Sequence, residues 1–132
     1  MTQAPLVTGT DFVTVATTDL ARARRFYTEV LGLMESSVWQ RPGQEPIGAE
    51  VETGTLTLAL VDSAALGIPF RPNDHPIALH VDDFEPARAT LESRGVRFTG
   101  DTIDSGVCHQ IYFRDPDGNT VGIHHRYAPP GR

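Results

Sequence analysis

Lysine is absent from this 132-residue chain, in which all 11 basic residues are arginine. This absence excludes chemistries that need a lysine amine, such as Schiff-base catalysis, a P-loop phosphate site and a serine–lysine dyad. With 17 acidic residues the formal net charge is −6. An acidic chain without lysine disfavours nonspecific binding to nucleic acid or to anionic membranes.

Cysteine and long apolar runs are equally scarce. The single cysteine, Cys108, has no partner for an internal disulfide and suits a reducing compartment. No apolar run approaches the roughly 18 residues of a membrane span, and residues 1–10 lack the basic and apolar regions of a secretory signal. We therefore expect a soluble, cytoplasmic protein.

An internal repeat at a spacing of 64 residues organises the chain. Val13 falls on Ile77, Asp19 on Asp83, and later in each half Gly54 falls on Gly118. Neither half is long enough to close a useful core alone. We expect a single domain, 1–132, of two modules at about 10–62 and 75–126, joined by a linker at 63–74.

Each half predicts one strand, one helix and then further strands. In the first half, Asp19 is a good N-cap for a helix to about Leu31, which Gly32 would end. The corresponding helix runs from Asp82 or Asp83 to about Arg94, and a possible capping box joins Asp82 to Glu85. The strands are expected near 12–16, 34–40, 47–52, 55–61, 77–81, 97–98, 107–113 and 120–126.

Two motifs complete this pattern. They are Asp-Leu…Phe-Tyr…Leu-Gly-Leu at 19–33 and the tight-turn sequence Phe-Arg-Asp-Pro-Asp-Gly-Asn at 113–119. Together with the tandem repeat, they resemble the vicinal oxygen chelate superfamily of glyoxalase I, fosfomycin-modifying enzymes, extradiol dioxygenases and bleomycin-binding resistance proteins. The resemblance implies an α+β fold of two tandem βαβββ modules. Their curled mixed sheets would have helices outside and a ligand cavity inside. It also implies a homodimer, with pockets where modules of both chains meet.

The resemblance also implies where a metal would sit. Metal-dependent members place ligands at positions that correspond to Phe12, Pro76 and Gly122, and some add a fourth at the repeat partner of Gly122, which we take as Leu58. None of these side chains can coordinate a divalent cation. We therefore expect no metal and no cofactor, and assign no catalytic residue.

Strand parity predicts which residues face the cavity. If the positions at 12, 58, 76 and 122 point inward, the even residues of those strands do so too. A two-residue turn at Thr53-Gly54 would pair Val51 with Leu56. The phase of Trp39 is ambiguous. The predicted ligand-binding residues are Phe12, Thr14, Trp39, Leu56, Leu58, Leu60, Pro76, Ala78, His80, Cys108, Gln110, Tyr112, Gly122 and His124.

This set describes an apolar, partly aromatic pocket with few polar groups, which suits a sizeable organic ligand. Our leading hypothesis is a metal-independent protein that sequesters a bulky apolar or aromatic antibiotic or metabolite, as in drug or self-resistance. One alternative is a metal-dependent glyoxalase-like lyase or isomerase with relocated ligands such as His80 and His124. Another is a cofactor-free isomerase or cyclase that uses His80 or Tyr112. The arginines at 22, 24, 25, 88, 94 and 97 are interpreted as solvent or partner contacts.

Overall fold

The computed structural model describes residues 4–129, which form two four-stranded mixed sheets. In the first module the strands lie in the order β1-β4-β3-β2, and in the second in the order β5-β8-β7-β6. Each sheet has one parallel pair at its edge, β1–β4 in the first sheet and β5–β8 in the second, and the remaining pairs are antiparallel. The strands are β1 (Phe12–Thr17), β2 (Met34–Gln40), β3 (Pro46–Glu52), β4 (Thr57–Asp62), β5 (Ile77–His80), β6 (Ile103–Asp104), β7 (Cys108–Arg114) and β8 (Thr120–Arg126).

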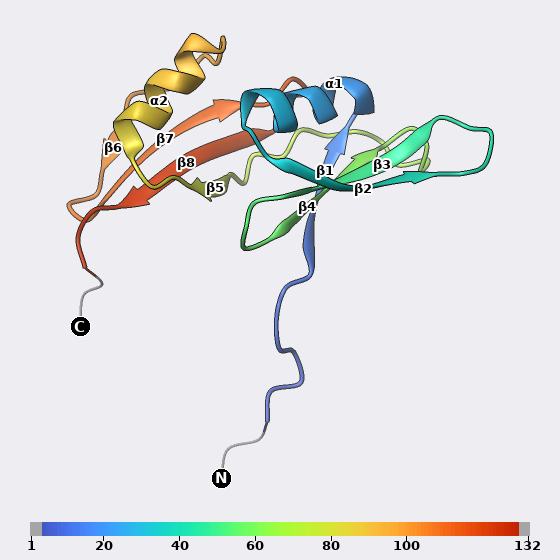
Figure 1. Ribbon diagram of the computed structural model, residues 1–132, viewed down its shortest axis with the longest axis horizontal. Coiled ribbons are helices and arrows are strands. Elements are labelled where there is room, and N and C mark those ends of the chain that lie inside the picture. The colour runs from blue at the N-terminus through green and yellow to red at the C-terminus, as the bar shows by residue number, and fades with distance from the viewer. Residues whose placement is uncertain (1–3, 130–132) are drawn as a thin grey trace.

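The helices lie on one side of the two sheets (Figure 1). Helix α1 (Leu20–Arg25) continues as a π-helical segment, η1 (Phe26–Val30), and the second module has α2 (Phe84–Ser93). The α+β architecture predicted from the sequence is confirmed. No helix among residues 4–129 is both long enough and apolar enough to cross a membrane.

The predicted ends of the first helix are confirmed, but the capping box of the second is not. Asp19 accepts a hydrogen bond from the Arg22 backbone N–H at 3.1 Å, and Gly32 takes a φ of 76° just after η1. The second helix begins after Asp83, whose side chain makes no capping hydrogen bond. The N-cap position is Asp83, so Asp82 lies one residue too early to form the predicted capping box with Glu85, and its carboxylate contacts His80.

Two apolar cores lie between the sheets and their helices. Tyr27 of η1 and Val15 of β1 belong to the first, and Phe113 of β7 belongs to the second. Partly buried Phe26 and Leu31 pack against both, which joins the two modules on the helical side. Burying one such large side chain contributes about 1.5–3 kcal/mol relative to leaving it exposed.

The predicted pairing of β3 with β4 is wrong by two residues. The structure pairs Val51 with Leu58, not with Leu56, because the connection is the four-residue loop 53–56 and not a two-residue turn. The connection of β7 to β8 is longer, since it spans residues 115–119. Because η1 adds one residue between Asp19 and Gly32, the repeat spacing is 63 rather than 64 at β4 and β8. Ala59 rather than Leu58 therefore corresponds to Gly122.

The one-residue shift of the repeat, and not the two-residue error in pairing, reverses the predicted faces of β4. Leu58 pairs with Val13 and Leu60 with Val15, so both leucines point toward α1 and belong to the first core. Their placement on the cavity wall is therefore wrong, since residues paired in register share a face. Leu56 lies in the loop before β4 and is half-buried.

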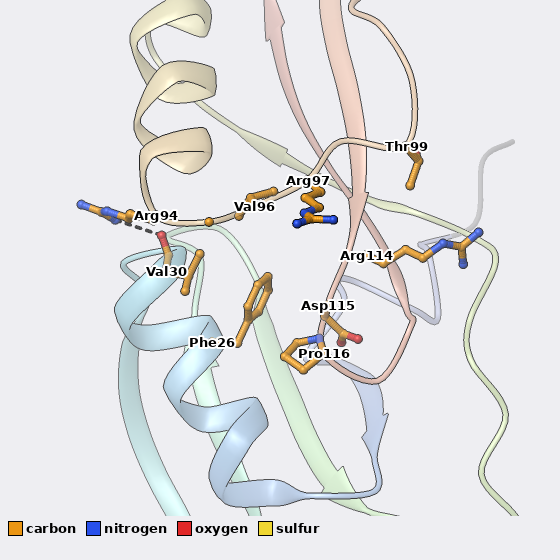
Figure 2. A pocket seen from close by; sticks show the side chains of 10 residues that line it. Phe26, Val30, Arg94, Val96, Arg97, Thr99, Arg114, Asp115 and Pro116 are labelled. Carbon is orange, nitrogen blue, oxygen red and sulfur yellow. Dashed lines mark hydrogen bonds between the residues drawn. The ribbon is translucent and has the colours of Figure 1, made fainter.

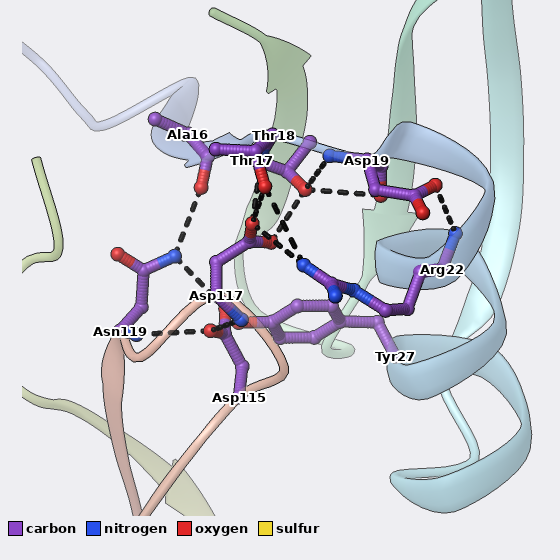
Figure 3. Close-up of polar contacts among 9 residues, drawn as sticks. All are labelled: Ala16, Thr17, Thr18, Asp19, Arg22, Tyr27, Asp115, Asp117 and Asn119. Carbon is purple, nitrogen blue, oxygen red and sulfur yellow. Dashed lines mark hydrogen bonds and ion pairs between the residues drawn. The ribbon is translucent and has the colours of Figure 1, made fainter. Parts of the chain in front are cut away.

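The turn at 115–119 fastens the second module to the first (Figure 3). Asp115 is buried, and its Oδ2 accepts hydrogen bonds from the Tyr27 hydroxyl at 2.7 Å and from Asn119 Nδ2 at 2.9 Å. Burial, followed by the charge and hydrogen bond of Asp115, raises the pKa of Tyr27. Asn119 also donates to the carbonyl of Ala16 at the end of β1. The tight turn predicted at this sequence is confirmed.

Asp117 adds a charged contact to the same junction. Its carboxylate accepts hydrogen bonds from the hydroxyls of Thr17 and Thr18 and pairs with the Arg22 guanidinium at 3.1 Å. Partial burial by itself would raise the pKa of Asp117, but these hydrogen bonds and the Arg22 charge outweigh it and lower that pKa.

Candidate functional site

The face of each sheet opposite its helix is the candidate ligand-binding surface, and we call it the inner face. In the second module, β5, β8 and β7 place His80, His124 and Gln110 in one row across three strands. The next row holds Ala78, Gly122 and Tyr112. The parity prediction therefore places these residues on the correct face of the second sheet.

The Tyr112 ring packs directly on Gly122. A Cβ added to Gly122 would approach the Tyr112 ring carbons Cδ1 and Cε1 to 2.6 and 2.7 Å, which no real contact allows. Only glycine therefore lets the ring lie on the strand here. The Tyr112 hydroxyl donates a hydrogen bond to Gln110 Oε1 at 2.9 Å, which fixes the ring's direction. The result is a half-buried aromatic surface on the second inner face.

The first module holds a similar aromatic surface. Trp39 pairs with Gly48 across β2 and β3, and a Cβ on Gly48 would come within 2.4 Å of the indole Cε3. Gly48 in turn pairs with Val61 of β4, which pairs with Ala16 of β1. The structure therefore resolves the ambiguous phase of Trp39 and places it on the first inner face. The indole is 37% exposed and can meet a ligand.

The rest of the first inner face is mixed in character. Phe12, Thr14 and Ala16 lie on it, as predicted from parity. Sequence reasoning missed the glutamates Glu50 and Glu52, which the register brings to the same face. Hydrogen bonds from Ser36 and then from Thr57 lower the pKa of Glu52. The sequence does contain a signal for this: Glu50 and Glu52 are two residues apart in β3, so they share a face once β3 is paired with β4.

The residues at the family's metal positions do not fit a metal ion. The space beside Gly122, where a ligand side chain would start, is filled by the Tyr112 ring. Phe12 is an exposed hydrocarbon ring, and Pro76 lies just before β5. Among residues 4–129, no group of three or more histidine, cysteine or acidic side chains is arranged to hold a metal ion.

His80 has the contacts that a general base would use. Its Nε2 lies 2.9 Å from Asp82 Oδ1, and its side chain is 68% exposed on the second inner face. His124, its neighbour across β5 and β8, is half-buried. Cys108 is buried beside Arg126, whose Nη1 is 4.0 Å from its Sγ.

The inner faces formed by residues 4–129 are largely open, since Phe12 and Trp39 are both exposed there. A hollow of about 130 Å³ lies at the seam of the modules, where Thr14 and Ala16 of β1 meet Asn73 and Thr120. Phe12 remains 52% exposed, and the two aromatic surfaces lie on different sheets. A large ligand bound to either inner face would therefore stay partly uncovered by this chain.

This fold and these faces define a class of protein. The chain belongs to the Glyoxalase/Bleomycin resistance protein/Dioxygenase superfamily, whose family model matches residues 9–123. The glutathione transferase FosA of Serratia marcescens is 30% identical over 116 residues, which cover 85% of this chain and 77% of that protein.

Two solved structures show the same fold. The antibiotic binding protein TnmS3 from Streptomyces sp. CB03234 is 23% identical with a TM-score of 0.74, over 93% of this chain and 99% of that one. A superfamily member from Sphaerobacter thermophilus DSM 20745 is 23% identical with a TM-score of 0.75, over 91% of this chain and 98% of that one.

Proposed function

We propose that this protein binds and sequesters a bulky apolar or aromatic small molecule, such as an antibiotic, without a metal ion. The observation that carries this proposal is the Tyr112 ring packed on Gly122. An aromatic surface stands where metal-dependent relatives would need a ligand. The similarity to an antibiotic binding protein agrees with this function, as does membership in a superfamily that includes bleomycin resistance proteins.

The inner faces offer two aromatic surfaces and a few polar groups. Stacking on Tyr112 or Trp39 contributes about 0.5–1.5 kcal/mol per aromatic pair beyond the burial of area. Beside Tyr112, the row of His80, His124 and Gln110 supplies donors and acceptors that can orient the ligand. Such a site is typical of a large, mostly apolar ligand with few polar groups.

We propose further that the working form is a homodimer. Ligand sites usually bury 70–90% of the ligand surface, and one chain leaves both inner faces open. A second copy placed inner face to inner face would cover the exposed rings of Phe12 and Trp39. It would also bring an aromatic surface from one chain opposite the aromatic surface of the other. Sedimentation equilibrium with and without ligand tests this arrangement.

Titration with hydrophobic polycyclic antibiotics tests the proposed function directly. The protein is purified without an affinity tag, treated with a chelator, and titrated by quenching of Trp39, the one tryptophan. We expect binding near 1–10 μM or tighter, about 7–8 kcal/mol, that is unchanged by added divalent metal. The Tyr112→Leu variant should bind at least several-fold more weakly. Binding that requires stoichiometric metal would contradict the proposal.

A second candidate is cofactor-free proton transfer, because His80 is held by Asp82 on the inner face. In that case His80→Ala would abolish conversion of the bound compound, whereas it would weaken simple binding only modestly. Mass spectrometry of the recovered ligand separates the two: an unchanged ligand supports sequestration. The third case is a metal-dependent glyoxalase-like enzyme with relocated ligands, and elemental analysis of the untagged protein tests it.

A further inference from the structure

A second pocket lies on the helical side of the molecule, away from the inner faces (Figure 2). It has a volume of about 410 Å³ and lies between η1, the segment after α2, and the start of the turn at 115–119. Its apolar lining comes from Phe26, Val30, Val96 and Pro116. A volume of this size accommodates a small organic molecule.

Three arginines line this pocket, although the chain as a whole is acidic. Figure 2 shows Arg97 between Arg94 and Arg114, near the ring of Phe26. Arg97 is exposed, and among residues 4–129 its side chain takes part in no hydrogen bond or ion pair. Its guanidinium therefore keeps all five N–H donors for a ligand.

The other two arginines are held in place but keep spare donors. Arg94 Nη1 donates to the carbonyl of Val30 at 2.9 Å, and Arg114 Nη1 donates to the carbonyl of Gly118 at 3.2 Å. Neither forms an ion pair with a carboxylate in the described part of the chain. Both contacts use a single nitrogen of the guanidinium, so each side chain is oriented without losing its charge.

The one acidic residue of the pocket does not neutralise these arginines by direct pairing. Asp115 is 5% exposed, and its carboxylate is engaged by Tyr27, by Asn119 and by the backbone N–H groups of Asp117 and Asn119. Its oxygens accept four donors from within the fold. The pocket therefore presents cationic groups beside an apolar wall and no free acceptor from Asp115.

The internal repeat supplies a comparison within the same chain. The two helices end at their C-caps, Leu31 and Arg94, each followed by a glycine of positive φ, so at this point the repeat spacing is 63. Arg94 and Arg97 therefore correspond to Leu31 and Met34. Leu31 lines a neighbouring pocket of about 290 Å³, to which Arg94 also contributes. The same structural positions are apolar in one module and arginine in the other, so the fold itself does not require arginine there.

We propose that the pocket at Arg97 is a binding site for a compact organic anion, an apolar ring that carries a carboxylate. The ring would pack on Phe26, Val96 and Pro116, and the carboxylate would accept hydrogen bonds from Arg97. The guanidinium groups of Arg94 and Arg114 extend away from the cavity and would add only longer-range positive charge (Figure 2). Guanidinium groups recognise carboxylates through paired N–H donors. This site is separate from the inner faces and goes beyond the proposed sequestration function.

The test uses 2-naphthoate and its neutral analogue 2-naphthylmethanol, titrated into the full chain and followed by ¹H–¹⁵N NMR. We expect saturable shifts for naphthoate at Val96, Arg97 and Thr99, and at least tenfold weaker binding of the alcohol. A charged hydrogen bond contributes about 1.5–3 kcal/mol, so Arg97→Gln should weaken naphthoate roughly tenfold or more. Arg97→Lys should restore part of the loss.

Arg25→Gln is the matched control, because Arg25 is an exposed arginine of α1 outside this pocket. It removes the same charge and should leave naphthoate affinity unchanged. Equal affinity of the alcohol and the acid would overturn the proposal. So would shifts centred on Tyr112 and Gly122, because the anion would then occupy the inner face. A change in oligomeric state with Arg97→Gln, without a change in naphthoate affinity, would show an interface between copies and also overturn it.

Discussion

The contact of Tyr112 with Gly122 can be tested by adding a single methyl group. In Gly122→Ala the new Cβ would meet the ring at 2.6 Å and the Ile111 carbonyl oxygen at 3.2 Å, so the ring has to move. Overpacking of this kind costs about 1–3 kcal/mol. With a urea m-value of about 1.5 kcal/mol/M, the unfolding midpoint should fall by roughly 1–2 M.

A double-mutant cycle shows whether the ring causes this cost. In a Tyr112→Ala background the methyl group meets only the carbonyl oxygen, so the loss from Gly122→Ala should shrink by at least about 1 kcal/mol. Gly100→Ala is the control, because nothing lies within 4 Å of its Cβ and its φ is not positive. That substitution should change stability by less than about 0.5 kcal/mol. An equal cost for Gly122→Ala with and without Tyr112 would refute the packing described here.

The remaining predictions concern the core and the junction of the modules. Tyr27→Phe leaves the buried Asp115 without one of its donors and should cost about 1.5–3 kcal/mol in urea unfolding, while the secondary structure by circular dichroism stays unchanged. Leu60→Ala should lower the free energy of unfolding by about 2–5 kcal/mol, because Leu60 is fully buried against α1. Leu56→Ala should lower it far less. Similar losses for the two variants would show that β4 faces the other way. The pKa of Asp117 is lowered in the folded protein, so its ionised carboxylate stabilises the fold at pH values above its ordinary pKa. This stabilisation is lost as the pH falls through the folded pKa. Between pH 7 and pH 3 the Asp117→Asn variant should therefore lose less stability than the parent chain.

The inner face of the second module could be predicted from the sequence, because side chains in β5 and β8 alternate between the two faces without interruption. Alternation in β5 and β8 placed His80, Gly122 and His124 on the inner face, as the register shows. The prediction failed at β4 of the first module because one extra residue in η1 shifts the repeat spacing from 64 to 63. A slip of one residue moves every side chain of a strand to the opposite face. Leu58 and Leu60 did not reveal the error, because an apolar stripe is equally compatible with a core and with a ligand site.

Other features depend on contacts that no local pattern encodes. The strand β2 contains irregularities of register around Ser36 and after Trp39, so its alternation does not reveal where the indole points. The pocket at Arg97 on the helical side is lined by Phe26, Arg97 and Arg114, which lie far apart in the sequence. Each of these residues alone resembles an ordinary core or surface position. Only the packing of η1 against the second module brings them together.

The π-helical segment η1 has a consequence far from the first helix. Asp19 and Gly32 are 13 residues apart, whereas Asp83 and Gly95 are 12 residues apart, so the first module carries one extra residue within its helix. From these glycines onward, Ala59 and Gly122 lie the same distance along the chain. The wider helical turn thus absorbs an insertion that no loop has to accommodate, and it moves β4 by one position against β8. A single residue inserted in a helix therefore decides which side chains of a distant strand a comparison of the two halves assigns to the ligand site.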